Sequence, residues 1–253
     1  MIVCVLSSGS KGNCTYVKTK KHNILIDIGT SSLYVEKALR SINVNPSDID
    51  IILITHAHID HVKGLKVFSK KYHPLVYISD KILKEANLEI ENVSSNEIVD
   101  YESDISIKSI KLSHDVTDIK GYVIEEDNSS VVYITDTGYI NEKNFDKIKN
   151  KSVYVFESNH DVEKLMNNSN YPHHTKIRIL SDKGHLSNVD SAYYLTKLIG
   201  NNTKCVILAH LSEQNNTDEL ALNALKKSLT KKNIKLNKVL VAHQNELTEK
   251  INI

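Results

Sequence analysis

Short apolar runs separated by polar turns make up most of the chain. Runs rich in Val, Ile and Tyr are typical of strands buried in a sheet. They predict strands at 2–6, 13–19, 23–29, 50–55, 75–79, 105–113, 121–127, 130–136, 152–158, 204–210 and 237–243. Helices are predicted at 31–42, 60–72, 188–200 and 217–232, with further helical stretches within 161–182. Strands come first as hairpins, one of them turning at 127–129, and later alternate with helices. This order predicts a mixed sheet system covered by helices.

The length and composition fit one α/β domain spanning residues 1–253. No Pro/Gly-rich linker, fixed-period repeat or low-complexity run marks a domain boundary. The net charge of +1 gives no overall attraction to nucleic acid or membrane, so binding to a polyanion would need a local basic patch.

The three cysteines favour a reducing compartment. Cys4, Cys14 and Cys205 form no C-x-x-C pair, and an odd number without a disulfide framework is typical of reducing surroundings. The apolar run at the N-terminus is too short for a signal peptide or a membrane span. We therefore expect a cytoplasmic protein with no membrane contact.

The strand predicted at 50–55 leads into T-H-A-H-I-D-H, residues 55–61. Packing does not explain so many histidines, because neutral imidazole gains little from burial and protonated imidazole loses by it. His56 and His58 are two positions apart and project to the same side of an extended chain end, while Asp60 and His61 follow where the chain turns into a helix. The motif predicts a site for two metal ions and disfavours a merely solvated histidine-rich loop. Imidazole and carboxylate without thiolate suit Zn, Mn or Fe.

Four later candidates for metal ligands stand at the ends of predicted strands: His114, Asp136, His210 and His243. Strand ends that converge on one edge of a sheet are where α/β proteins gather their sites. Taken alone, His114 and His210 are equally compatible with a structural role. His243 lies in VLVAH, which mimics the CVILAH context of His210, and we assign it a structural role.

These motifs together resemble a known family. THAHIDHVKG, preceded by LIDIG and followed by LSHD, YITDTG and LAHLS, is similar to the metallo-β-lactamase-fold hydrolases. SSGSKGNCTYV, ESNHD, SDKGHLSN and LAHLSEQNN resemble the bacterial YycJ/WalJ (VicX) branch. The resemblance covers nearly the whole chain and implies a four-layer αβ/βα sandwich, in which two β-sheets face each other between outer helices.

The resemblance also implies roles for individual residues. One metal would be held by His56, His58 and His114, the other by Asp60, His61 and His210, with Asp136 bridging both. Asp27 would orient the histidine loop without binding metal.

Two divalent metals can hold a hydroxide that attacks phosphorus and can clamp both reacting oxygens of a phosphodiester, but the same pair also hydrolyses lactones and thioesters. His185 in SDKGHLSN resembles the histidine of the G-H-S-T segment of RNase Z enzymes and would protonate the leaving oxygen. The alternative is that His185 is a residue at the N-terminus of a helix, without a function in catalysis. Glu157 and His160 lie where the nuclease members carry an acidic residue that orients the proton donor, and His160 could equally be a surface loop residue.

A basic stretch precedes His185. Lys176, Arg178 and Lys183 are candidates for contacts to substrate phosphates, with a solvated helix face as the alternative.

The leading hypothesis is a metal-dependent phosphodiesterase on nucleic acid, specifically the 5′–3′ DNA exonuclease that the resemblance implies. The second is a small-molecule thioester or lactone hydrolase of the glyoxalase II or lactonase type, which shares T-H-x-H-x-D-H. Too few residues separate Asp136 from His210 in the sequence to include the β-CASP domain that larger nuclease relatives insert after the aspartate motif. A compact nuclease would close its cleft with its own loops or as a homo-oligomer.

Overall fold

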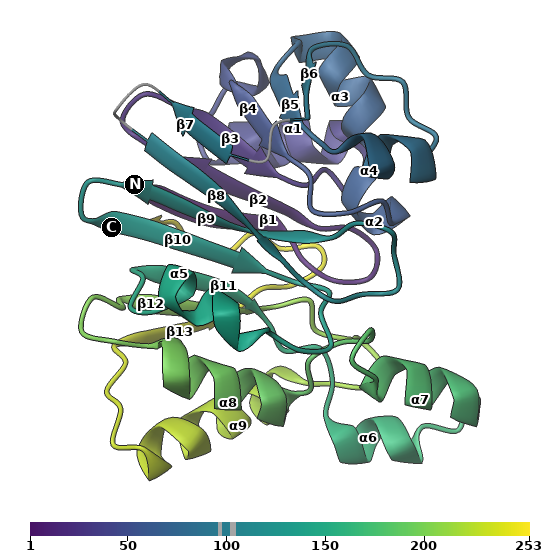
Figure 1. Ribbon diagram of the computed structural model, residues 1–253, viewed down its shortest axis with the longest axis vertical. Helices are drawn as coiled ribbons and strands as arrows, with labels where there is room; N and C mark the ends of the chain where they lie inside the picture. Colours follow the sequence, from purple (N-terminus) through teal and green to yellow (C-terminus); the bar gives the residue numbers. More distant parts are fainter. Residues whose placement is uncertain (96–97, 102–104) are drawn as a thin grey trace.

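The structure is a computed structural model that describes residues 1–95, 98–101 and 105–253. Two mixed β-sheets face each other in the middle of the molecule, with helices on both outer faces (Figure 1). The first sheet contains, in spatial order, β14 (Ile251–Asn252), β1 (Ile2–Ser7), β2 (Cys14–Lys18), β3 (Asn23–Ile26), β4 (Ile51–Leu53), β5 (Leu75–Tyr77) and β6 (Val93–Ser94). The second contains β13 (Lys238–Val241), β12 (Cys205–Ala209), β11 (Val153–Glu157), β10 (Ser129–Ile134), β9 (Lys120–Glu126), β8 (Ile105–Lys111) and β7 (Ile98–Tyr101). The predicted αβ/βα sandwich is confirmed.

Helices cover the outer face of each sheet (Figure 1). Beside the first sheet lie α1 (Ser32–Ser41), α2 (Ile59–Val62), α3 (Leu65–Tyr72) and α4 (Asp80–Glu85), with a 3₁₀ turn at Pro46–Asp48. On the side of the second sheet lie α5 (Phe145–Ile148), α6 (Val162–Asn167), α7 (His173–Leu180), α8 (Asn188–Leu198) and α9 (Asp218–Lys231), with a 3₁₀ turn at Glu142–Asn144. Helices α6 and α7 extend from the rest of the molecule at the lower right of Figure 1.

The hydrophobic core has three layers, and the strand alternation explains why. On β1, Val3 and Val5 point into the layer between the two sheets, whereas Cys4 and Leu6 point into the layer beneath α1 and α3. A third layer lies between the second sheet and α8 and α9. Because both faces of each sheet are buried, the strands read as nearly continuous apolar runs in the sequence.

Pairing direction decides where the strand ends meet. β3, β4, β5 and β6 pair in parallel, and so do β10, β11, β12 and β13. Parallel strands bring their carboxyl ends to one edge of a sheet, so the residues that follow β3, β4, β10, β11 and β12 can form one site. The hairpin predicted at 127–129 is confirmed, since Ser129 pairs with Glu126.

The helix predicted at 60–72 is wrong in one respect, because the chain breaks it into α2 and α3 at Gly64. A Cβ at Gly64 would lie 2.4 Å from the Thr30 carbonyl oxygen, and the Gly64 N–H donates to Ile28 at 2.9 Å. The close approach to the β3–α1 loop therefore requires glycine and redirects the chain. The sequence analysis also missed α4, α5 and the short strands β6, β7 and β14.

Candidate metal centre

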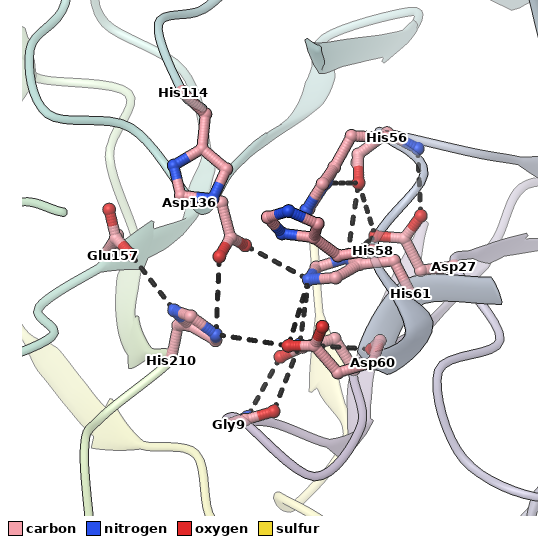
Figure 2. A network of polar contacts seen from close by, with 12 residues as sticks. Gly9, Asp27, His56, His58, Asp60, His61, His114, Asp136, Glu157 and His210 are labelled. Atoms are coloured by element: carbon pink, nitrogen blue, oxygen red, sulfur yellow. Dashed lines mark hydrogen bonds and ion pairs between the residues drawn. The ribbon is translucent and has the colours of Figure 1, made fainter. Parts of the chain in front are cut away.

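Seven side chains that the sequence nominated as ligands converge at one edge of the sandwich (Figure 2). Sets with ligand atoms within 4.8 Å of one another are His56/His58/His114, His56/His61/Asp136, Asp60/His61/His210 and Asp136/Glu157/His185/His210. Four of these residues follow strands: His56, His114, Asp136 and His210 come after β4, β8, β10 and β12. Asp60 and His61 lie in α2, Glu157 is the last residue of β11, and His185 lies between α7 and α8. The folded chain thus joins the histidine loop after β4 to positions more than a hundred residues later.

Three residues of the site adopt left-handed backbone conformations directly or closely after their strands. Asp27, Asp136 and His210 have φ of 60°, 57° and 57°. Such conformations cost roughly 1–3 kcal/mol for residues other than glycine and persist only where the surroundings impose them. They turn the side chains away from the continuing strand direction and toward the cluster.

Asp27, for which the sequence analysis predicts an orienting role, contacts the histidine loop at two residues. Its carboxylate accepts hydrogen bonds from the Thr55 N–H at 2.8 Å and the Thr55 hydroxyl at 2.9 Å, and lies 2.7 Å from His61 Nδ1. Both the Asp27 and the His61 side chains are fully buried. With Nδ1 donating to Asp27, the neutral His61 ring has its lone pair on Nε2, inside the cluster.

Glu157 orients two imidazole rings, those of His185 and His210. One of its oxygens accepts from Nδ1 of His185 at 2.8 Å and from Nδ1 of His210 at 3.0 Å. The other accepts from the backbone N–H of Thr137 at 3.0 Å and of Leu186 at 3.1 Å. Burial alone would raise the pKa of Glu157, but its histidine partners hold it at about 2. Glu157 is therefore an ionised carboxylate that fixes both rings with Nε2 turned away from it.

The inner atoms of the cluster are mostly acceptors facing acceptors. Asp136 Oδ2 lies 3.1 Å from His61 Nε2, and its Oδ1 lies 3.4 Å from His210 Nε2. Over the described part of the chain, Asp136 Oδ2, His56 Nε2 and His210 Nε2 are buried without a hydrogen-bond partner. Leaving such atoms unpaired costs about 1–3 kcal/mol each.

The pKa shifts of two buried histidines also indicate that the cluster favours positive charge. Burial opposes protonation of His210, yet Asp136, Asp60 and Glu157 raise its pKa to about 10. His61 behaves likewise: burial opposes protonation, and Asp136 and Asp27 raise its pKa well above the ordinary value. Burial and the neighbouring His61 lower the pKa of His56. The buried carboxylates therefore favour positive charge at the imidazoles of His61 and His210. Divalent cations fit the same donor set of imidazole nitrogens and carboxylate oxygens, without thiolate.

His56, His58 and His114 are called the first histidine set below, and they include the most exposed of the seven candidate ligands, His58. The side chain of His58 is 39% exposed, and that of His114 is 2% exposed. His114 Nδ1 donates to the Gly184 carbonyl at 3.1 Å, which leaves Nε2 directed at the cluster. Gly184 directly precedes His185, so the segment that carries the candidate proton donor also orients this ring.

The structure separates the remaining candidates. His160 is buried, its Nδ1 lies 3.3 Å from Asn159 Oδ1, and it belongs to none of the ligand sets found among the described residues. It is not the surface loop residue that the sequence allowed. His243 pairs with Asp218 at 3.3 Å and is likewise outside those sets. His210 lies near the ligands because β12 is an inner strand of the sheet, whereas His243 follows the edge strand β13.

The basic residues lie on or just after α7. Arg178 contacts Asp115, which follows His114, and so lies beside the first histidine set. The amine of Lys176 donates to the Met166 carbonyl at 2.7 Å, and Lys183 is exposed. Of the three, only Arg178 has a contact that ties it to the rim of the cluster.

Two supporting residues had no role in the sequence analysis. Thr55 joins Asp27 to the histidine loop, and its place directly before His56 was the available signal. Asn13 Nδ2 lies 3.0 Å from His61 Nε2, and the Asn13 N–H donates to the Asp60 carbonyl at 2.8 Å. No local pattern identifies Asn13, because its contacts come from a loop far away in the sequence.

Comparison with known families agrees with this fold. Residues 8–176 match the family model described as "Metallo-beta-lactamase superfamily", and the chain belongs to this superfamily. It is 39% identical to the exodeoxyribonuclease WalJ of Streptococcus pneumoniae over 226 residues, which cover 86% of this chain and 84% of WalJ. It is 36% identical to the exodeoxyribonuclease YycJ of Bacillus anthracis over 249 residues, 96% of this chain and 94% of YycJ. The family resemblance inferred from the motifs is confirmed.

A solved structure agrees in fold. The metallo-β-lactamase fold protein YhfI from Bacillus subtilis matches with a TM-score of 0.70 at 14% identity, over 98% of this chain and 99% of YhfI. Within the described ranges, none of the helices combines the length and the apolar character needed to cross a bilayer.

Proposed function

We propose that the protein is a metal-dependent exodeoxyribonuclease that hydrolyses phosphodiester bonds of DNA in the 5′–3′ direction. The similarity to WalJ and YycJ over most of the chain supports the reaction, and the cluster of histidines and aspartates supports the need for metal. The first metal would be held by His56, His58 and His114, the second by Asp60, His61 and His210, and Asp136 would lie between them. Two bound cations, of Zn, Mn or Fe, would supply charge stabilisation at the reacting oxygens and lower the pKa of water.

One observation carries the choice of a phosphodiester over a thioester. His185 is held at Nδ1 by the buried Glu157 at 2.8 Å, and its side chain is 17% exposed, so its Nε2 is free to meet a substrate. A departing sugar oxygen needs a proton, and a positioned general acid contributes about 10²- to 10⁴-fold. A thiolate is a far weaker base and leaves without this help. An oriented histidine beside the metal ligands is therefore a feature of an enzyme with an alkoxide leaving group.

The proton path uses only residues of this chain. Glu157, ionised and buried, accepts a hydrogen bond from His185 Nδ1 and keeps its ring in one orientation. His185 also lies 3.7 Å from Asp136 through Nδ1, so it stands at the edge of the proposed second metal. Arg178, and more weakly Lys176 and Lys183, would contact phosphates that flank the scissile bond.

The test is hydrolysis by metal-loaded protein of end-labelled single- and double-stranded DNA, of RNA and of a thioester. We expect mononucleotide release from the 5′ end of DNA, loss of all turnover in Asp60→Ala, and slow cleavage with normal metal content in His185→Ala. His243→Ala is the matched control, since this residue also follows a strand of the second sheet but pairs with Asp218. Thioester turnover without cleavage of nucleic acid would contradict the proposal.

A further inference from the structure

Asp115 is in none of the ligand sets given above, yet its carboxylate lies beside two members of the first histidine set. Its Oδ1 lies 3.1 Å from His114 Nε2 and 3.8 Å from His58 Nε2. Its Oδ2 accepts a hydrogen bond from Nη1 of Arg178 on α7. The Asp115 side chain is 28% exposed, so this carboxylate lies at the solvent side of the cluster.

The contact between Asp115 and His114 is unfavourable unless a cation takes part. His114 Nδ1 carries the hydrogen that the Gly184 carbonyl accepts, at 3.1 Å. In the neutral ring that metal binding requires, Nε2 then presents a lone pair to the Asp115 carboxylate. Two acceptors at this separation repel each other. The same arrangement occurs between His61 and Asp136, at 3.1 Å, in the interior of the cluster.

The spacing is that of two ligands on one ion. Nitrogen and oxygen ligands lie about 2.0–2.2 Å from a zinc ion, which puts them about 3.0–3.4 Å from each other in tetrahedral or octahedral arrangements. The 3.1 Å between Asp115 and His114 lies in this range, and the 3.8 Å to His58 is slightly longer. Arg178 holds the opposite carboxylate oxygen, which leaves Oδ1 as the oxygen turned toward the imidazoles.

We propose that Asp115 is a further oxygen ligand of the first metal, beside His58 and His114, and that Arg178 fixes its carboxylate in place. This inference rests on the proposed metal-dependent function. It adds a negative charge to a set that otherwise contains neutral imidazoles and the shared Asp136. A cation at this more exposed position is thereby bound more tightly, and Arg178 becomes a positioning residue as well as a candidate phosphate contact.

The experiment is a Co²⁺ titration of metal-free protein followed by visible absorption, which reports the ligands of each ion without any need for activity. The variants are Asp115→Asn and Asp115→Ala. Asp118→Asn is the matched control, because Asp118 lies in the same loop but accepts from the Ser79 hydroxyl at 2.6 Å. Circular dichroism verifies the folding of each variant, and the two substitutions differ in size, so an effect that both share does not come from a packing defect of one of them.

We expect one of the two Co²⁺ ions to bind roughly 10- to 100-fold more weakly in both Asp115 variants, with a changed absorption band, while the control titrates like the wild type. Wild-type titration and spectra in both variants would overturn the assignment of Asp115 and leave the nuclease proposal intact. Less than one equivalent of Co²⁺ in the wild-type protein would overturn both.

Discussion

Replacing Glu157 with glutamine tests the arrangement that links the proposed proton donor to the metal ligands. The carboxylate accepts from Nδ1 of His185 and His210 at 2.8 and 3.0 Å, and from the backbone N–H of Thr137 and Leu186 at 3.0 and 3.1 Å. Glutamine has nearly the same shape but only one accepting oxygen. Its NH₂ group must face either the two imidazoles or the two backbone donors, so one pair of donors loses its acceptor.

The size of the effect follows from these contacts. A hydrogen bond to a charged group contributes about 1.5–3 kcal/mol, so two lost bonds reduce the free energy of unfolding by roughly 3 kcal/mol or more. Where the amide faces the imidazoles, His210 is free to place its hydrogen on Nε2, which removes it as a ligand. We expect metal affinity at this site to fall about 10- to 100-fold. Turnover should fall about 10²- to 10⁴-fold even at saturating metal, because His185 loses the acceptor that orients its ring.

The assay measures turnover of labelled DNA over a range of metal concentrations, together with metal content and the midpoint of urea unfolding. Glu126→Gln is the control, because Glu126 is also buried but accepts from the Lys20 N–H at 2.9 Å, at the end of β9. If Glu157→Gln kept wild-type turnover and metal content, the reasoning about the two histidines would be refuted.

Three further predictions concern the backbone contact at Gly29, the pH dependence of stability and the removal of metal. Gly29→Ala places a Cβ 1.6 Å from the Asp60 carbonyl oxygen, and we expect a loss of metal and of roughly 3 kcal/mol of stability. A Cβ in Gly200→Ala would approach only the side chain of Asn150, so this control variant should lose less stability. Calorimetric unfolding of the two variants measures the difference. Burial lowers the pKa of His160 from 6.5 to about 4, so the unfolded chain takes up this proton first as the pH falls. His160 therefore reduces stability between these two pH values, on the order of 3 kcal/mol in full. Urea unfolding of His160→Gln at pH 7 and pH 4 should lack this loss, and equal pH dependence in both proteins would exclude it. Chelation of metal-loaded protein should lower the melting temperature by about 10 °C, since ligand at a thousandfold its Kd contributes about 4 kcal/mol. An unchanged melting temperature would mean that the cluster binds no metal.

The sequence was most informative where the site is local. Residues 55–61 carry four candidate ligands in one stretch, and their spacing alone indicated a metal site. The distant residues required the positions of strand ends and the family resemblance. The structure brings Asp136 and His210 to the same place because β10, β11 and β12 are parallel neighbours.

What the sequence did not predict depends on contacts between distant segments. The double contact of Glu157 follows from the convergence of three loops, and the sequence analysis assigned no role to Asp115. The strands β6, β7 and β14 are short, and their pairing partners, rather than their own apolar content, stabilise them. The break at Gly64 depends on the β3–α1 loop, which no helical pattern within 60–72 can reveal.

The hydrogen bonds around the site also determine how metal binding and folding are coupled. Asp27 and Glu157 hold their histidines through contacts made entirely by protein groups, and three hydrophobic layers fix the strands that carry them. The left-handed conformations at Asp27, Asp136 and His210 occur directly or closely after strands that these layers bury. A small zinc domain, in contrast, folds only with its metal because it has no such core. Metal should therefore add stability to this protein without being required for its secondary structure, because the hydrophobic layers hold the strands together.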